Sequence, residues 1–227
     1  MRNVPNPPRK PTKPSPPDHP EASGAWLDEL TPLTLRPNGM WDPEQHAWGG
    51  ESAQIEDWLK PILEAGARPM YAMEQVLPGD DPDDPDSDPI LEAVELHQTG
   101  DEAAARQLLL RVAERDPRCL DAHAHLGSMA FDQDLVRALA HYGTGVEIGR
   151  RALGPDFKGV LPWYLIDNRP YLRCLHGYAL CLWRTGRFEE AERAILELLS
   201  LNPSDNLGAR LALPKVRARE EWRDEEG

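Results

Sequence analysis

The chain has 227 residues, of which 40% are apolar and 28% are charged, and its formal net charge is −14. This length can bury one fair-sized hydrophobic core, and the negative charge argues against a protein that binds nucleic acid or an anionic membrane. No apolar run approaches the roughly 20 residues that cross a bilayer, and no apolar stretch follows Arg2 as it would in a secretory signal.

Residues 1–24 form a proline-rich, weakly basic segment. It carries eight prolines and four basic residues, and one valine is its only branched aliphatic side chain. Such a segment buries too little apolar surface to offset the entropy lost on ordering, so we expect a disordered tail. Its run Pro8-Arg9-Lys10-Pro11 has the spacing that proline-binding domains recognise, although proline-rich tails also reach this spacing by chance.

Residues 25–78 are expected to form an acidic, tryptophan-rich region that is partly helical. Only residues 52–67 have apolar side chains at helical spacing, and Pro61 interrupts them, so this helix is either kinked or begins late. The sequence Arg-Pro-Asn-Gly at residues 36–39 is typical of a turn. We expect the tryptophans of this region to pack on each other or on the domain that follows. They are Trp26, Trp41, Trp48 and Trp58.

Residues 79–89 contain six aspartates and three prolines. Because the aspartates repel one another and the prolines block regular structure, we predict an extended linker. A calcium-binding loop is the alternative, since Asp81, Asp83 and Glu92 have part of the required spacing. The turn glycine of such a loop is missing and Pro85 stands at a ligand position, so the linker is preferred.

Residues 90–213 contain a repeated spacing. A glycine is followed by an alanine five residues later and by a proline seventeen residues later, at Gly100, Ala105 and Pro117 and again at Gly186, Ala191 and Pro203. The glycine can end a first helix in the left-handed conformation, and the alanine lets a second helix approach the first closely. The proline ends the second helix. Such pairs bury their apolar stripes only by stacking on neighbours.

These residues resemble the tetratricopeptide-repeat (TPR) family. The sequence TGRFEEAE at residues 185–192 is similar to that family's inter-helix turn, and TGDEAAA at residues 99–105 is similar to it as well. A middle unit at residues 120–153 is degenerate but keeps Leu126-Gly127. More narrowly, residues 168–210 resemble bacterial TPR-like proteins of unassigned role. The resemblance implies an all-α solenoid of about three helix-turn-helix repeats, and a function in binding a protein or peptide.

The last two parts of this domain depart from the repeat spacing. Residues 153–168 are an insertion of about half a unit, after which a helix restarts with Asn168 as its cap. Residues 204–222 are expected to form a capping helix that Pro214 can break into two pieces. The whole repeat domain is therefore placed at residues 90–222.

The three cysteines fit a reducing, cytoplasmic environment. Cys174 and Cys181 lie seven residues apart, about 10 Å along a helix, which is too far for a disulfide. A disulfide from Cys119 to one of them stays open, as does a zinc site. The candidate ligands of that site are Cys119, His123, His125, His141, Cys174 and His176. No Cys-x-x-Cys or His-x-x-x-His pair supports a metal, so we expect the cysteines to be core residues.

The function expected is that of an adaptor or scaffold, because no catalytic or phosphate-binding motif is present. We expect no cofactor and no enzyme activity. In stacked helix pairs the first helices line a concave groove. The candidate groove residues are His97, Gln98, Asp121, Phe131, Arg173, His176, Trp183, Arg184 and Arg210, with Ile90, Val94, Ala124, Ser128, Asp132 and Leu180 on the same faces.

Several alternatives stay open at this point. The arginines of the groove favour an acidic peptide, or they simply pair with nearby Glu189 or Glu190. An enzyme or metal-binding protein with its site between residues 25–78 and the repeats is the rival function. The aspartate-rich linker, or the acidic region before it, can also be imagined lying over the groove and competing with an outside ligand. Neither the partner nor the oligomeric state follows from the sequence.

Overall fold

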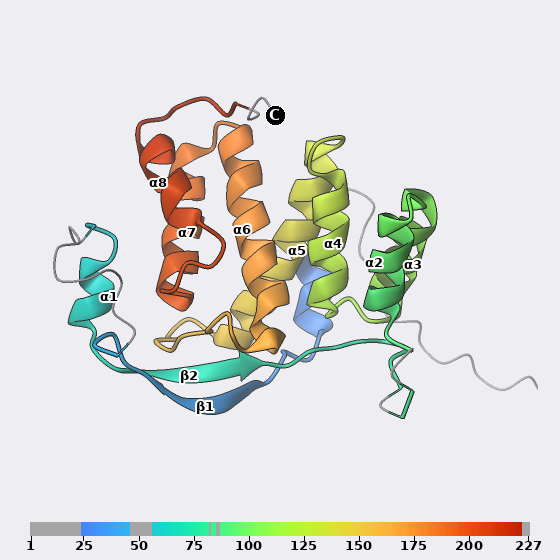
Figure 1. The fold of residues 1–227 in the computed structure, drawn as a ribbon, viewed down its shortest axis with the longest axis horizontal. Helices are drawn as coiled ribbons and strands as arrows, with labels where there is room; N and C mark the ends of the chain where they lie inside the picture. The colour runs from blue at the N-terminus through green and yellow to red at the C-terminus, as the bar shows by residue number, and fades with distance from the viewer. Residues whose placement is uncertain (1–23, 46–55, 82, 85–86, 224–227) are drawn as a thin grey trace, which may run out of the picture.

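The computed structural model describes residues 24–45, 56–81, 83–84 and 87–223. Within these ranges the chain forms eight α-helices, two short 3-10 helices and one two-stranded sheet. The helices stand side by side, and the sheet runs beneath their ends (Figure 1). The fold is therefore mostly helical, in rough agreement with the all-α expectation, and a small two-stranded sheet in the N-terminal region is an addition to it. The proline-rich tail lies outside the described residues except for Gly24.

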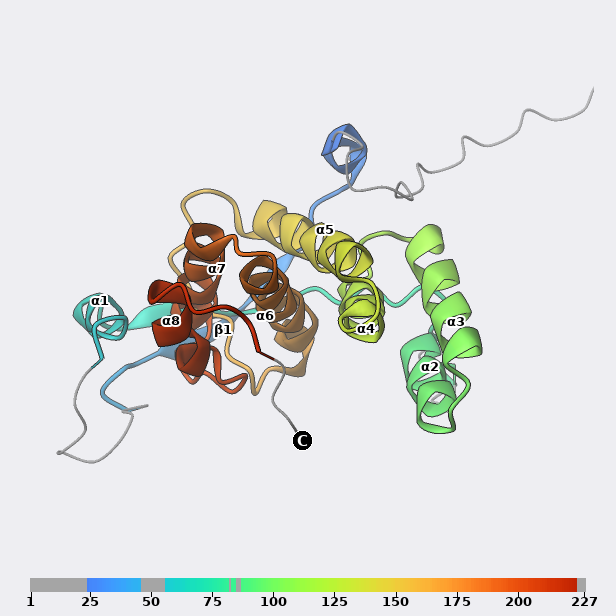
Figure 2. The same ribbon diagram turned by 90° about the horizontal axis from the view of Figure 1, so that it is seen from above.

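Three pairs of consecutive helices and a final helix make up the body of the molecule. The pairs are α2 (Pro89–Gln98) with α3 (Glu102–Arg115), α4 (Leu120–Ala130) with α5 (Leu135–Leu153), and α6 (Arg169–Arg184) with α7 (Phe188–Leu201). The final helix is α8 (Ala209–Arg217). Figure 2 shows the pairs following one another across the molecule in chain order. None of the helices formed by the described residues has the length and apolar character needed to cross a bilayer.

The glycine–alanine spacing has the structural role that the sequence predicted. Gly100 and Gly186 have φ angles of 89° and 72°, and each ends the first helix of a pair in the left-handed region. Ala105 and Ala191 are both 0% exposed. They lie in the second helices of these pairs, where a larger side chain would hold the two helices apart.

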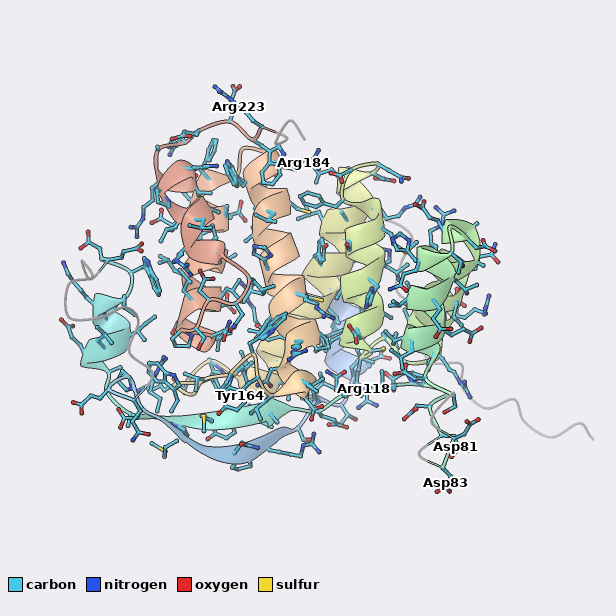
Figure 3. The ribbon with its side chains drawn as sticks, in the orientation of Figure 1. Asp81, Asp83, Arg118, Tyr164, Arg184 and Arg223 are labelled. Carbon is cyan, nitrogen blue, oxygen red and sulfur yellow. The ribbon has the colours of Figure 1, made fainter. Side chains whose placement is uncertain are left out.

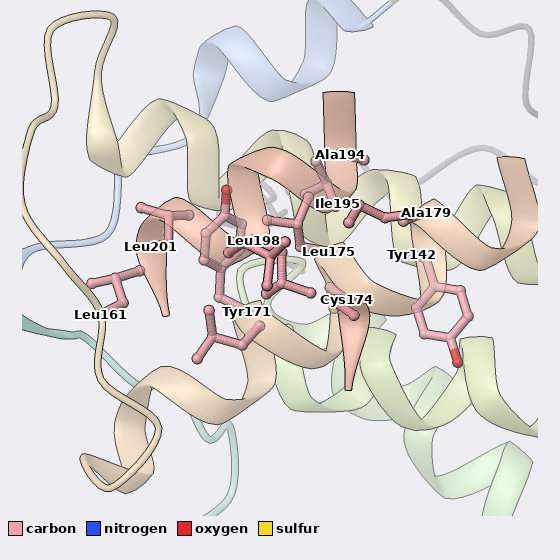
Figure 4. Packing of buried hydrophobic residues seen from close by; sticks show 14 of the residues in the cluster. Tyr142, Leu161, Tyr171, Cys174, Leu175, Ala179, Ala194, Ile195, Leu198 and Leu201 are labelled. Atoms are coloured by element: carbon pink, nitrogen blue, oxygen red, sulfur yellow. The ribbon is translucent and has the colours of Figure 1, made fainter. Parts of the chain in front are cut away.

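The main core lies between α5, α6 and α7. Tyr171, Leu175 and Ile195 are fully buried there, and Figure 4 shows them among the other apolar side chains. The helices α5 and α6 approach closely because glycines of α5, which have no side chain, leave room for bulky side chains of α6. A β-carbon built on Gly149 would lie 2.1 Å from the ring of Tyr171. A smaller apolar cluster joins α2 and α3 to the outer side of α4.

The sheet is formed by β1 (Leu35–Trp41) and β2 (Arg68–Met73), which pair antiparallel from Leu35 opposite Met73 to Trp41 opposite Arg68. The prediction of a turn at residues 36–39 is wrong, because these residues lie inside β1. The register shifts between Pro37 and Met40. Gly39, at φ 89°, allows this bulge in the strand, and proline is tolerated there because the ladder is interrupted.

The sheet is attached to the helices through the insertion between α5 and α6. Val160 exchanges backbone hydrogen bonds with β2, since its N–H donates to Pro69 and its carbonyl accepts from Tyr71. Asn168 precedes α6 but makes no capping bond, contrary to expectation. Its fully buried amide instead accepts from the Met73 N–H and donates to the carbonyls of Tyr71 and Pro162.

The remaining N-terminal elements are short. They are the 3-10 helix η1 (Gly24–Glu29) and α1 (Lys60–Glu64), and a second 3-10 helix, η2 (Ile166–Asn168), precedes α6. The predicted helix at residues 52–67 is longer than α1 over the residues that the structure describes. The helix begins late, which is one of the two outcomes expected from Pro61, because this proline occupies the first turn of α1. Trp41 and Trp58 are buried in the main core, and Trp48 lies outside the described residues.

Two further boundaries differ from the predictions. The described part of the 79–89 linker is turned and not extended, since the Asp84 N–H donates to the Asp81 carbonyl. The hydroxyl of Ser87 also donates to the backbone carbonyl of Asp84. The capping helix is confined to α8, with Pro214 inside it and not at a break. It is shorter than residues 204–222 because the buried carboxylate of Asp205 caps its start and Arg219, at φ 54°, leaves the helical conformation.

Candidate functional site

A pocket of about 350 Å³ opens between α4 and α6, the first helices of two successive pairs. These two helices also contact each other directly. We call this cavity the α4–α6 pocket. Its wall combines small, apolar, aromatic and charged side chains from five segments of the chain. They are Ala124, His125, Ser128, Phe131, Asp132, Tyr142, Arg173, His176, Gly177, Leu180 and Leu207.

The floor of the pocket depends on Tyr142, which reaches in from α5. A β-carbon built on Gly127 of α4 would lie 2.6 Å from its ring, and one on Gly177 of α6 would lie 2.2 Å away. Only glycine at both positions therefore lets the ring stand between the two helices. Burial raises the pKa of Tyr142, while a hydrogen bond with Ser128 opposes the rise. The phenol consequently stays protonated at neutral pH.

A polar group stands at one side of the pocket. Arg173 and His125 both approach the same oxygen of Asp121, with N···O distances of 3.5 Å and 3.6 Å. Burial raises the pKa of Asp121, and the neighbouring His125 and Arg173 oppose that rise. Burial lowers the pKa of His125 and takes that of His176 to about 4. Both imidazoles are therefore neutral near pH 7, and Arg173 is the cation of the pocket wall.

Arg173 also connects the pocket to an aromatic surface on the insertion. Its guanidinium carbon lies 5.7 Å from the centre of the Trp163 ring, and that of Arg169 lies 5.2 Å from the same ring. The Arg169 Nε–H donates to the Trp163 carbonyl at 3.0 Å. Tyr164 and Ile166, in the same loop, are 55% and 69% exposed. Through Arg173 the pocket wall thus contacts a tryptophan of the insertion, whose loop also carries two exposed large side chains.

The structure brings four of the nine predicted groove residues together. Phe131, Arg173 and His176 line the α4–α6 pocket, and Asp121 contacts Arg173 beside it. His97 and Gln98 are exposed at the end of α2 and do not line this pocket. Among the other residues predicted on these faces, Ala124, Ser128, Asp132 and Leu180 line it, whereas Ile90 is buried in the smaller core cluster.

The remaining three predicted groove residues have structural partners. Trp183 is only 8% exposed, and its indole N–H donates to the Glu220 carbonyl at 2.8 Å. Arg184 donates to the carbonyl of Phe131 and to the carboxylate of Asp132. Helical spacing assigns Trp183 and Arg184 to the open groove, but the C-terminal segment covers Trp183.

Arg210 does not continue the row of groove arginines. Its guanidinium bonds the buried carboxylate of Asp205 at 2.9 Å, and the two residues together shape the start of α8. The alternative pairing of Arg173 and Arg184 with Glu189 or Glu190 is also wrong. They pair instead with Asp121 and Asp132, in and after α4, so these contacts join α6 to the preceding helix pair.

The cysteines and histidines considered for zinc are divided between the core and the wall of the α4–α6 pocket. All three cysteines are free and buried, so the open disulfide from Cys119 is not formed. The rings of His123 and His141 lie 5.8 Å apart, and the Nε2 of His123 bonds the Pro117 carbonyl. Across the described ranges, no group of three or more His, Cys, Asp or Glu side chains is arranged to hold a metal ion.

A second cavity, of about 730 Å³, lies between the N-terminal region and the helix pairs. The alternative function, an enzyme or metal-binding protein, was expected to have its site in this part of the molecule. Its mainly apolar wall comes from the segment after η1, the end of α5 and the end of α7. Its arginines are paired within the wall: Arg150 binds both oxygens of Glu197, and Arg151 contacts Glu147 and Asp28.

The aspartate-rich segment does not lie over the α4–α6 pocket. Figure 3 places Asp81 and Asp83 below α2, at the opposite end of the helices from Arg184. The described residues of the acidic N-terminal region pack against the insertion and the main core instead. The prediction that either segment competes for the groove is therefore wrong for the part of the chain that the structure describes.

The sequence reasoning missed two contributors to the site. Tyr142 lies on a second helix, and its ring enters the pocket only because of two glycines on neighbouring helices. The signal was present in Gly127, Tyr142 and Gly177, but it becomes meaningful only when the three helices are packed together. Leu207 reaches the pocket from the loop before α8.

No protein-family model, curated protein or solved structure matches this chain.

Proposed function

We propose that this protein is an adaptor that binds a protein or peptide segment in the α4–α6 pocket, on the concave face of a TPR-like domain of bacterial type. The observation that carries the proposal is the position of this pocket between the first helices of two successive pairs. Left-handed Gly100 and Gly186, and fully buried Ala105 and Ala191, support the comparison with TPR units. The insertion before α6 and the sheet are additions to that plan.

The chemistry of the pocket favours an extended peptide. Phe131 and Leu180 offer apolar contact. His176 and Ser128 offer hydrogen-bonding groups that are uncharged near pH 7. Arg173 adds one cation that suits a carboxylate on the ligand. A few polar groups set among apolar ones fix the orientation of a bound segment. An acidic peptide is therefore the ligand that we propose first.

Binding is proposed in place of catalysis, and the cytoplasm is proposed as the location. Burial raises the pKa of the Cys119 and Cys181 thiols to about 12, and also raises that of Cys174. These thiols are consequently protonated and inaccessible, which is opposite to what a nucleophile requires. Their free state supports a reducing compartment.

The test is a selection of short random peptides displayed on phage against the full-length protein. Ser128→Trp fills the pocket from an exposed position, and Gln107→Trp adds the same side chain to the exposed face of α3 as a control. We expect peptides enriched on the parent protein to be lost on Ser128→Trp and kept on Gln107→Trp. Equal retention by both variants, or no enriched peptide, would contradict the proposal.

A further inference from the structure

The chain after α8 turns back across the ends of the repeat helices. Arg219, at φ 54°, makes the turn, and the Glu220 N–H donates to the Lys215 carbonyl to close the helix end. The Arg219 side chain then pairs with Glu189 and lies 6.0 Å from the centre of the Phe188 ring, both at the start of α7. Figure 1 shows this final segment passing over α7 toward the end of α6.

Trp222 of this segment is held in a site that we call the aromatic notch, formed by Phe131, Trp183 and Arg184. Its ring meets that of Trp183 edge-on at 4.8 Å and that of Phe131 at 5.8 Å. The guanidinium carbon of Arg184 lies 5.6 Å from the centre of the Trp222 ring. Edge-to-face rings and a cation over an indole are contacts that favour tryptophan over other side chains.

A second contact recognises the backbone of the segment. The indole N–H of Trp183 donates to the carbonyl of Glu220, two residues before Trp222, at 2.8 Å. The notch therefore recognises a tryptophan side chain together with the main-chain carbonyl two positions before it. This combination suits an extended segment.

The walls of the notch are fixed by contacts that do not involve Trp222. Arg184 donates to the Phe131 carbonyl at 2.7 Å and to the Asp132 carboxylate at 3.0 Å. Its guanidinium carbon also lies 4.8 Å from the centre of the Phe131 ring. These bonds join the end of α6 to the end of α4, so the site is already assembled when a tryptophan enters it. Preorganisation of this kind raises affinity.

We propose that the aromatic notch is a binding site for extended peptide segments that carry a tryptophan, and that residues 218–223 occupy it in cis. Phe131 belongs both to the notch and to the α4–α6 pocket, so Trp222 closes one end of the groove. The inference goes beyond the proposed function and does not depend on the ligand of the pocket. A partner with an exposed Glu-Glu-Trp or similar segment would displace Trp222.

The tethered segment sets how strongly an outside peptide must compete. A short tether gives an intramolecular ligand an effective concentration in the millimolar range. The apparent affinity for an outside peptide is its intrinsic affinity multiplied by the fraction of molecules in which the notch is open. Removing the Trp222 side chain should therefore strengthen binding of the outside peptide without any change in the notch itself.

The experiment uses the full-length protein and a fluorescent synthetic peptide with the sequence of residues 217–227. We expect Trp222→Ala to bind this peptide saturably, and the parent protein to bind it about tenfold or more weakly. A peptide with alanine in place of the tryptophan should not bind either protein. Equal binding to parent and variant, or no binding by the variant at millimolar peptide, would overturn the proposal.

Two further variants separate the notch from the pocket. Adding Phe131→Leu to Trp222→Ala removes one aromatic wall and should abolish peptide binding, with the helical circular dichroism retained as a check of folding. Adding Ser128→Trp instead should leave peptide binding intact, because that residue lies in the pocket and not in the notch. A parent dimer that becomes monomeric on Trp222→Ala would show that a second copy fills the notch, which would overturn occupation in cis.

Discussion

His123 is a titratable side chain inside the core of the repeats, where it is 1% exposed. Its Nε2 bonds the Pro117 carbonyl at 3.0 Å, so this nitrogen carries the proton in the neutral ring. Its Nδ1 has no partner among the described residues. A second proton would therefore be placed on a buried nitrogen without an acceptor. Burial and the nearby His141 accordingly lower the pKa of His123 to about 3.

The first prediction is a loss of stability in mild acid that depends on His123. Its folded pKa of about 3 lies below the ordinary value of 6.5, so the unfolded chain binds more protons between these limits. Stability is full above pH 6.5 and falls as the pH falls. For this residue the free energy of unfolding should drop by about 2 kcal/mol from pH 7 to 5. Buried His141, with a pKa of about 4, adds in the same direction.

Chemical denaturation at several pH values measures this effect. His123→Phe keeps a ring of similar size without a titrating group, so its free energy of unfolding should depend less on pH than that of the parent. The exposed His97→Phe serves as the control and should keep the parent's pH dependence. An unchanged slope for His123→Phe between pH 7 and 5 would show that protonation of this buried ring does not destabilise the fold.

At the scale of single elements, the distance between α5 and α6 depends on glycines at particular positions of α5. A β-carbon on Gly149 would lie 2.1 Å from the Tyr171 ring, whereas one on Gly143 would lie 3.4 Å from the Tyr178 ring. The first distance is a clash and the second is near ordinary contact. Both glycines are inside the same helix, where alanine is intrinsically the better helix former by about 1 kcal/mol.

The second prediction follows from this difference. Gly149→Ala should destabilise the protein by about 1–3 kcal/mol, because Tyr171 is fully buried and cannot move away without opening the core. Gly143→Ala should be neutral or stabilising by up to about 1 kcal/mol. Thermal unfolding monitored by circular dichroism compares the two variants. The same change in midpoint for both would mean that the helices are not held at the distance that the structure gives.

The elements that could be predicted from sequence are those whose contacts are local. Helices α2, α3, α6 and α7 follow from a glycine, an alanine and a proline at fixed spacing, because both members of each pair lie within one short stretch. The sheet could not be predicted in this way. Leu35 pairs with Met73, and Val160 joins β2 from far along the chain. No local pattern records such pairings, and a bulge disrupts the alternation of β1.

The candidate site was partly predictable for the same reason. Arg173 and His176 line the pocket together with Phe131, and helical spacing alone shows that the first two share a face of α6. Trp183 shares that face, but the C-terminal segment returns to cover it. The sequence places Trp222 near the end of a helix and contains no signal that the chain then reverses at Arg219.

The whole molecule is held together by contacts between its N-terminal region and the repeats. Leu33, Trp41 and Met73 are at most 3% exposed and belong to the same apolar cluster as the cores of α6 and α7. Asn168 adds three buried hydrogen bonds that connect β2, the insertion and the start of α6. The helix pairs α4–α5 and α6–α7 therefore share one apolar core with the N-terminal region. Their lower end is completed by a sheet from elsewhere in the chain.

The last prediction concerns a fragment of residues 87–227, which keeps every helix from α2 onward but lacks the sheet. Removing the sheet exposes Val160 and Leu161, both 0% exposed in the intact chain, and leaves the buried amide of Asn168 with only the Pro162 carbonyl. Each apolar side chain returned to water costs about 1.5–3 kcal/mol, and unmade buried hydrogen bonds cost about 1–3 kcal/mol. We expect the fragment to unfold at a clearly lower denaturant concentration than the full chain. The full-length variant Asn168→Ala, which loses the amide but keeps the sheet, should fall between them. A fragment as stable as the full chain would show that the repeats fold alone and that the sheet is only an attachment.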